Sequence, residues 1–67
     1  MLTLTINGQP RTFDYLNTVE DLLDQLKLDR RAVVVEVNEM VVKRSHIGDT
    51  YLQENDQVEI LRFVGGG

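Results

Sequence analysis

The side chains that could take part in acid–base chemistry gather around the single histidine of this sequence, His46. Ser45 precedes it and Asp49 follows closely, so the residue types of a serine–histidine–aspartate triad occur in one short segment. A triad needs three groups that converge in space, whereas adjacent residues of an extended chain point in opposite directions. We therefore interpret His46 as an exposed loop histidine rather than a general base.

Metal and phosphate chemistry have less support still. There is no cysteine, and one histidine with scattered carboxylates offers no ligand set for zinc. The acidic residues do not follow the spacing of a calcium loop. The terminal glycines lack the lysine and helix that follow a phosphate-binding loop. The sequence predicts no catalytic residue, no metal site and no cofactor bound by this chain.

Composition narrows the class of protein further. The chain has 67 residues, a net charge of −4 and a pI near 4.7, which indicates one small acidic domain. Nucleic-acid binders need cations that replace counterions along the phosphates, so the charge disfavours that role. It favours a protein partner with a basic docking face, or serves solubility alone. The longest apolar run, Ala32–Val35, cannot span a membrane, and no signal peptide is apparent. The absence of cysteine fits a reducing cytosol, so we expect a cytoplasmic protein. We also expect the chain to be a monomer when it is free.

The first fifteen residues have the pattern of a β-hairpin. Leu2, Leu4 and Ile6 alternate with threonines, which is the period of a half-buried strand. Asn7-Gly8 follows, a pair that tolerates the positive φ of a tight hairpin turn. We expect the returning strand to include Arg11–Tyr15, with Phe13 and Tyr15 on one face.

An amphipathic helix of about ten residues is predicted next. Thr18 and Asp21 have the spacing of a capping box, although aspartate replaces the usual glutamate or glutamine. From Val19 the apolar residues recur at helical spacing, so one stripe of the helix faces a core.

The second half of the sequence predicts strands and turns. Ala32–Val37 is β-branched and indicates an interior strand, and the chain returns through Asn38-Glu39 to Met40–Lys43. Tyr51 with Leu52 forms either a short strand or a plug. The last strand, Val58–Val64, places Val58 and Ile60 on one side and Leu61 and Phe63 on the other.

This order of elements predicts an α+β fold, the β-grasp or ubiquitin-like roll. One main helix would cover one face of a mixed sheet of four or five strands. We expect residues 1–64 to form this domain, and residues 65–67 to form a flexible glycine tail.

Three glycines, Gly65, Gly66 and Gly67, end the sequence. Without a Cβ, an extended tail of this length could reach about 10 Å into a narrow channel of another protein. The alternative is a remnant of cloning with no role.

A β-grasp of this length that ends in Gly-Gly resembles the ubiquitin-like sulfur carriers. Val37-Asn38 and Val64–Gly67 look most like the ThiS family, the sulfur carriers of thiamine biosynthesis. The resemblance implies a carrier rather than an enzyme. A ubiquitin-activating-like adenylyltransferase (ThiF-type) would use ATP to adenylate the Gly67 carboxylate. A sulfur-donating enzyme would then convert it to a thiocarboxylate, which donates sulfur to thiazole synthase (ThiG-type).

The resemblance also implies that Gly65 and Gly66 enter the partner's active site. Leu61, Phe63 and Val64 lie just upstream and form the expected docking surface, unless Phe63 caps an edge of the core. Three alternatives stay open: a carrier like the small subunit of molybdopterin synthase, a ubiquitin-like modifier, and an interaction domain with an idle tail.

Overall fold

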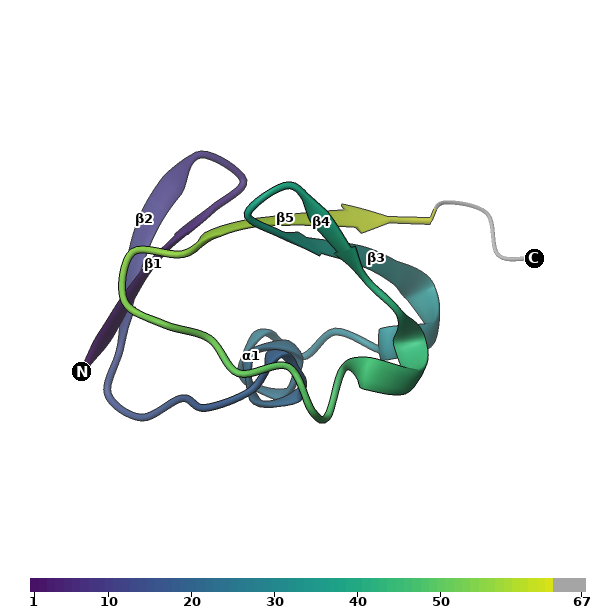
Figure 1. Ribbon diagram of the computed structural model, residues 1–67, viewed down its shortest axis with the longest axis horizontal. Helices are drawn as coiled ribbons and strands as arrows, with labels where there is room; N and C mark the ends of the chain where they lie inside the picture. The colour runs from purple at the N-terminus through teal and green to yellow at the C-terminus, as the bar shows by residue number, and fades with distance from the viewer. Residues whose placement is uncertain (64–67) are drawn as a thin grey trace.

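A computed structural model of the chain describes residues 1–63, and shows five strands in one sheet with a helix beneath it (Figure 1). The strand order is β2-β1-β5-β3-β4. Strands β1 and β5 are parallel, and the other neighbours are antiparallel. This is the mixed sheet that the sequence predicts, and its elements are β1 (Leu2–Ile6), β2 (Gln9–Phe13), α1 (Val19–Leu26), η1 (Arg30–Ala32), β3 (Val33–Val37), β4 (Met40–Val42), η2 (Arg44–His46) and β5 (Gln57–Arg62).

The β1–β2 hairpin is confirmed at its turn and is shorter than expected at its end. Asn7 and Gly8 both have positive φ, 49° and 82°, as a type I′ turn requires. The prediction for Tyr15 is wrong: β2 ends at Phe13, which is buried, and Tyr15 is 73% exposed. The chain bends at Asp14 and Tyr15, and this bend lets Leu16 reach the core instead.

The capping box predicted for α1 is present. The Asp21 amide donates to the Thr18 hydroxyl at 3.2 Å, and the Asp21 carboxylate accepts from the Thr18 amide at 3.0 Å. The helix has 8 residues, shorter than expected, because Lys27 adopts a left-handed conformation with φ of 60° and ends it.

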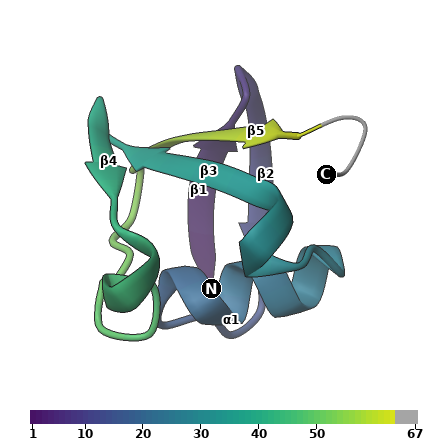
Figure 2. The same ribbon diagram turned by 90° about the vertical axis from the view of Figure 1, so that its right-hand side faces the viewer.

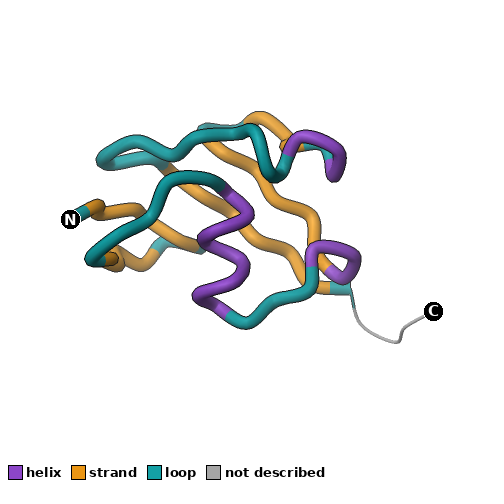
Figure 3. Tube along the Cα trace, turned by 90° about the horizontal axis from the view of Figure 1, so that it is seen from below, coloured by secondary structure: helices purple, strands orange, loops and turns teal. Residues whose placement is uncertain are grey.

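The core lies between the helix-facing side of the sheet and α1. The irregular segment before β5 closes one side of it, as Figure 3 shows from below. Tyr51 is exposed and forms only an isolated β-bridge with Thr18, so residues 51 and 52 make no strand. Leu52 is buried in the core, which confirms the second alternative, the plug. The buried hydrophobic residues are Leu4, Ile6, Phe13, Leu16, Val19, Leu22, Leu23, Val33, Val35, Ile47, Leu52, Val58 and Ile60.

Candidate functional site

The last strand, β5, occupies the middle of the sheet and leads the chain out of the fold. It lies parallel to β1 on one side and antiparallel to β3 on the other. The ladder with β3 reaches Arg62, which lies opposite Val33, and the Phe63 amide still donates to the Ala32 carbonyl at 2.9 Å. Figures 1 and 2 show this strand leaving at the end of the sheet near η1. The C-terminal residues therefore follow directly after a strand that is paired on both sides.

Two hairpin turns hold this strand with their asparagine side chains. Asn7 Oδ1 accepts from the Ile60 amide at 2.8 Å, and Asn7 Nδ2 donates to the Ile60 carbonyl at 3.1 Å. Asn38 Oδ1 accepts from the Gln57 amide at 3.0 Å, and its amide nitrogen donates to Asp56. The sequence predicts both asparagines as turn residues but not this second role. The hint was asparagine, rather than glycine, at the first position of both turns.

An apolar patch lies on the face of the sheet that points away from α1. Leu61 and Phe63 are each 57% exposed there, and Val34 is directly opposite Leu61 on β3. Val41 of β4, 62% exposed, extends the patch toward the edge. We call Val34, Val41, Leu61 and Phe63 the outer patch. The exposure of Phe63 does not fit the alternative that it caps an edge of the core.

Four of the predicted site residues, Val64, Gly65, Gly66 and Gly67, lie outside the described residues. The predicted boundary between the domain and its tail lies outside them as well. What the structure adds for this site is the position of the strand and of the outer patch that precede the glycines.

The alternative site around His46 has no catalytic geometry. Ser45 and His46 are exposed in η2, and the His46 amide is bonded to the Lys43 carbonyl at 2.8 Å. Within residues 1–63, no hydrogen bond joins the His46 side chain to a serine or a carboxylate, and no group of three or more acidic or histidine side chains could hold a metal ion.

Two aspartates have pKa values below their usual range, and both have structural rather than catalytic causes. Hydrogen bonds from the Thr18 and Asn17 amides lower the pKa of Asp21 at the start of α1. The side-chain hydrogen bond from Arg31 is the main cause that lowers the pKa of Asp29. Neither aspartate lies in the outer patch.

Comparison with known proteins identifies the family. The ThiS family matches residues 4–67, which is nearly the whole chain and includes the terminal glycines. This chain belongs to the ThiS family. The sulfur carrier protein ThiS of Bacillus subtilis is 36% identical over 50 residues, which cover 75% of this chain and 76% of that protein.

A solved ThiS structure confirms the β-grasp fold. The crystal structure of the thiamine biosynthesis protein ThiS from Geobacter metallireducens superposes with a TM-score of 0.83 at 39% identity. The match covers 98% of this chain and 100% of that one.

Other relatives are much longer than this chain. A thiazole synthase of Paramagnetospirillum magneticum is 41% identical over 66 residues, and a thiazole synthase of Magnetococcus marinus is 39% identical over 66 residues. The chain spans 20% of the length of each of these two proteins and 98% of its own. A ThiS-like segment thus occurs in proteins named thiazole synthase. Within residues 1–63, no helix is long and apolar enough to cross a membrane.

Proposed function

We propose that this chain carries sulfur for thiazole formation in thiamine biosynthesis, as a thiocarboxylate on Gly67. The observation that carries the proposal is the ThiS family match, which extends through the last residue. The relatives named thiazole synthase support that enzyme as the sulfur acceptor. They favour it over the acceptor of a molybdopterin pathway.

A carboxylate is a poor electrophile, so the chemistry must begin with activation. The Gly67 carboxylate attacks the α-phosphate of ATP on a ThiF-type adenylyltransferase, which forms the acyl-adenylate and releases pyrophosphate. A sulfur-donating enzyme supplies a hydrosulfide equivalent, which adds to the acyl carbon, and AMP leaves with the electron pair of its bond. Because the chain has no cysteine, any persulfide in this relay belongs to a partner. ATP is bound by the activating enzyme, and the carrier is its co-substrate.

The fold contributes a surface on which partners dock and a strand that leads to the C-terminal glycines. Leu61, Phe63 and Val64 form the docking surface, and Gly65 and Gly66 enter the partner's active site, where a side chain would collide with its walls. The exposure of Leu61 and Phe63 on one face supports this assignment. A patch of this kind beside the reacting end fits a protein that must dock on more than one enzyme.

Intact-mass measurement tests the proposal. The full chain is incubated with the adenylyltransferase, ATP and the sulfur-donating enzyme, and a mass increase equal to the exchange of one oxygen for one sulfur is expected. A chain that lacks Gly67 is the control and should show no increase. If the shortened chain takes up sulfur equally well, or the full chain takes up none, the proposal is wrong.

A further inference from the structure

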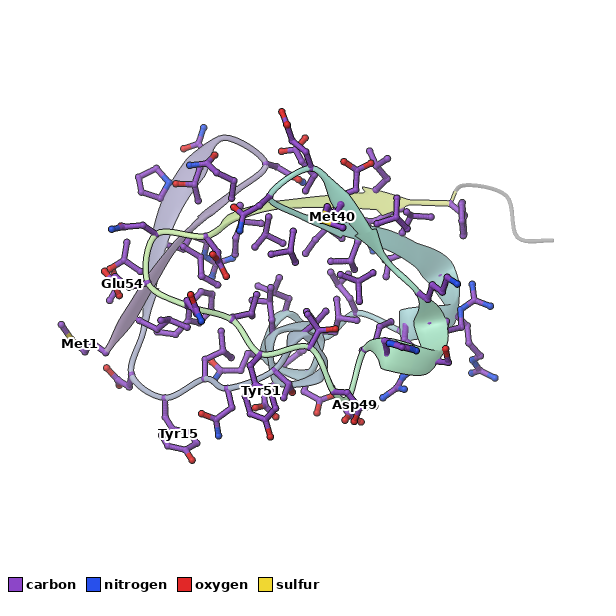
Figure 4. The ribbon with its side chains drawn as sticks, viewed as in Figure 1. Met1, Tyr15, Met40, Asp49, Tyr51 and Glu54 are labelled. Atoms are coloured by element: carbon purple, nitrogen blue, oxygen red, sulfur yellow. The ribbon has the colours of Figure 1, made fainter. Side chains whose placement is uncertain are left out.

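The charged side chains of this acidic protein are segregated along the sheet. Of its seven lysines and arginines, five belong to the two short 3-10 turns, the residue before the second turn, and the end of β5. We call this group the basic end, and its members are Arg30, Arg31, Lys43, Arg44 and Arg62. Figure 4 shows nitrogen-tipped side chains gathered around the two turns, on the side where β5 leaves the fold.

Contacts between the segments show that these residues share one end of the molecule. Arg62 lies opposite Val33, the residue that follows η1. Arg44 and Val33 line the same shallow hollow. The hydrogen bond from Arg31 is the main cause that lowers the pKa of Asp29, and the positive charge of Arg44 lowers it to a lesser degree. Asp29 precedes η1 and Arg44 belongs to η2, so this effect also indicates that the two turns lie near each other.

Only part of this positive charge is neutralised locally. Arg30 forms a salt bridge with Glu20, and Arg31 forms one with Asp29. Within residues 1–63, no salt bridge involves Lys43, Arg44 or Arg62. The five cations and these two carboxylates have a formal charge of +3, whereas the remaining nine carboxylates and two cations of the chain have −7.

The opposite end of the same strands is acidic. Glu36 of β3 lies directly opposite Glu59 of β5, and Glu39 occupies the turn between β3 and β4. Like charges in directly opposed positions of a sheet repel each other. The protein is therefore an electric dipole along β3 and β5, and its positive end is the end at which β5 leaves the sheet.

We propose that the basic end docks on an acidic protein surface around the mouth of the channel that receives the tail, and that this surface belongs to the ATP-dependent activating enzyme. The inference rests on the proposed function, because it presupposes that the tail enters a partner. From Arg62 to Gly67, five residues in extended conformation span at most about 18 Å. The partner's carboxylates must lie within that distance of its reaction centre.

The arrangement of the outer patch and the basic end resembles that of a protein interface, which has an apolar centre and a polar rim. The outer patch would supply the apolar centre, and the basic end would supply charged contacts at the rim. Opposite charges raise the association rate by about 10- to 1,000-fold and orient the encounter. A carrier that must find its enzyme with its C-terminus first benefits from a positive charge at that end. Nucleic acid is the poorer occupant, since the rest of the surface would repel its phosphates.

Charge reversal tests the inference on the full chain. The double variant Arg44→Glu, Arg62→Glu is compared with Arg11→Glu, Lys27→Glu, which changes the net charge equally at sites outside the basic end. Association with the ThiF-type adenylyltransferase of the same organism is followed by stopped flow at about 0.05 and about 0.5 M salt. The basic-end variant should associate about tenfold more slowly at low salt and lose most of the salt dependence. The control should stay within about threefold of the wild type.

Equal slowing by both variants would overturn the docking surface, because net charge alone would then explain the effect. An association rate that rises with salt for the wild type would overturn it as well. Circular dichroism checks that each variant folds. If the basic-end variant does not fold, the neutral double variant Arg44→Gln, Arg62→Gln replaces it. This variant should slow association in the same direction by a smaller factor. If the wild type associates as described and no adenylate forms, the proposed function fails while the docking surface stands. If adenylate forms and the charge reversal has no effect beyond that of the control, the docking surface fails while the proposed function stands.

Discussion

The side chain of Asn7 pairs with both backbone polar groups of Ile60, 53 residues further along the chain. It acts as one more residue of β1, because its amide reproduces the donor and acceptor that a strand neighbour would offer to β5. The Ile60 side chain is buried in the core, so this point of β5 is held both by its backbone and by its side chain.

Removal of the Asn7 amide should destabilise the fold without changing the turn. Asn7→Gly keeps the positive φ and loses both hydrogen bonds, and we expect the free energy of unfolding to fall by about 1–3 kcal/mol. Asn7→Ala should lose about 1 kcal/mol more, because alanine is strained in that conformation. Urea unfolding measures both. Equal stability of the glycine variant and the wild type would mean that the amide contributes nothing.

Loss of the helix cap should have a smaller effect. Thr18→Ala removes the hydroxyl that accepts from the Asp21 amide, and the free energy of unfolding should fall by about 1 kcal/mol. Thr18→Ser is the matched control, since it keeps the hydroxyl, and it should recover most of the loss. A serine variant as unstable as the alanine variant would assign the effect to the lost methyl group instead.

Acid should weaken the fold through Asp21 and Asp29. Both have a lowered pKa in the folded state, so their contribution is present above the ordinary aspartate value of about 4 and is lost as the pH falls through the lowered value. The free energy of unfolding should therefore decrease as the pH falls below about 4. Asp21→Asn should reduce this dependence, and the double variant Asp21→Asn, Asp29→Asn should reduce it further. Urea unfolding at a series of pH values measures the difference.

Truncation of the outer patch should affect binding more than stability. Phe63→Ala should raise the KM of the adenylyltransferase for the carrier about tenfold, because an exposed aromatic in the docking surface loses its contact area. Tyr51→Ala is the matched control, since Tyr51 is similarly exposed and lies away from the sheet's outer face (Figure 4). Its KM should stay within about twofold of the wild type. If the two variants raise KM equally, the outer patch has no special role.

A side chain in the tail should block the chemistry and spare the fold. Gly66→Val should abolish thiocarboxylate formation, measured by intact mass, because the branched side chain would not fit a narrow channel. The free energy of unfolding should change by less than about 0.5 kcal/mol. Thiocarboxylate formation at the wild-type rate would show that the channel accepts side chains.

The sequence by itself predicts the local features well, because each depends on residues that are neighbours in the chain. The turn at Asn7-Gly8 follows from two residues that tolerate positive φ, and the cap at Thr18 follows from the spacing to Asp21. The alternation in β5 likewise predicted that Leu61 and Phe63 would face away from Val58 and Ile60. The end of β2 was predicted wrongly, at Tyr15 instead of Phe13. The strand pattern continues through Tyr15, but burial of Leu16 in the core requires the chain to bend before it.

Tertiary structure alone decided what lies side by side. Local periodicity does not order strands, so the central place of β5 and the bonds from Asn7 to Ile60 could not be read from either segment. The same holds for charge. A net charge of −4 indicates an acidic surface, and by itself it favours a basic partner or a role in solubility alone. The fold brings η1, η2 and the end of β5 together, and so makes the end where β5 leaves the sheet positive, because electrostatic potential depends on positions in space and not on the sum of charges.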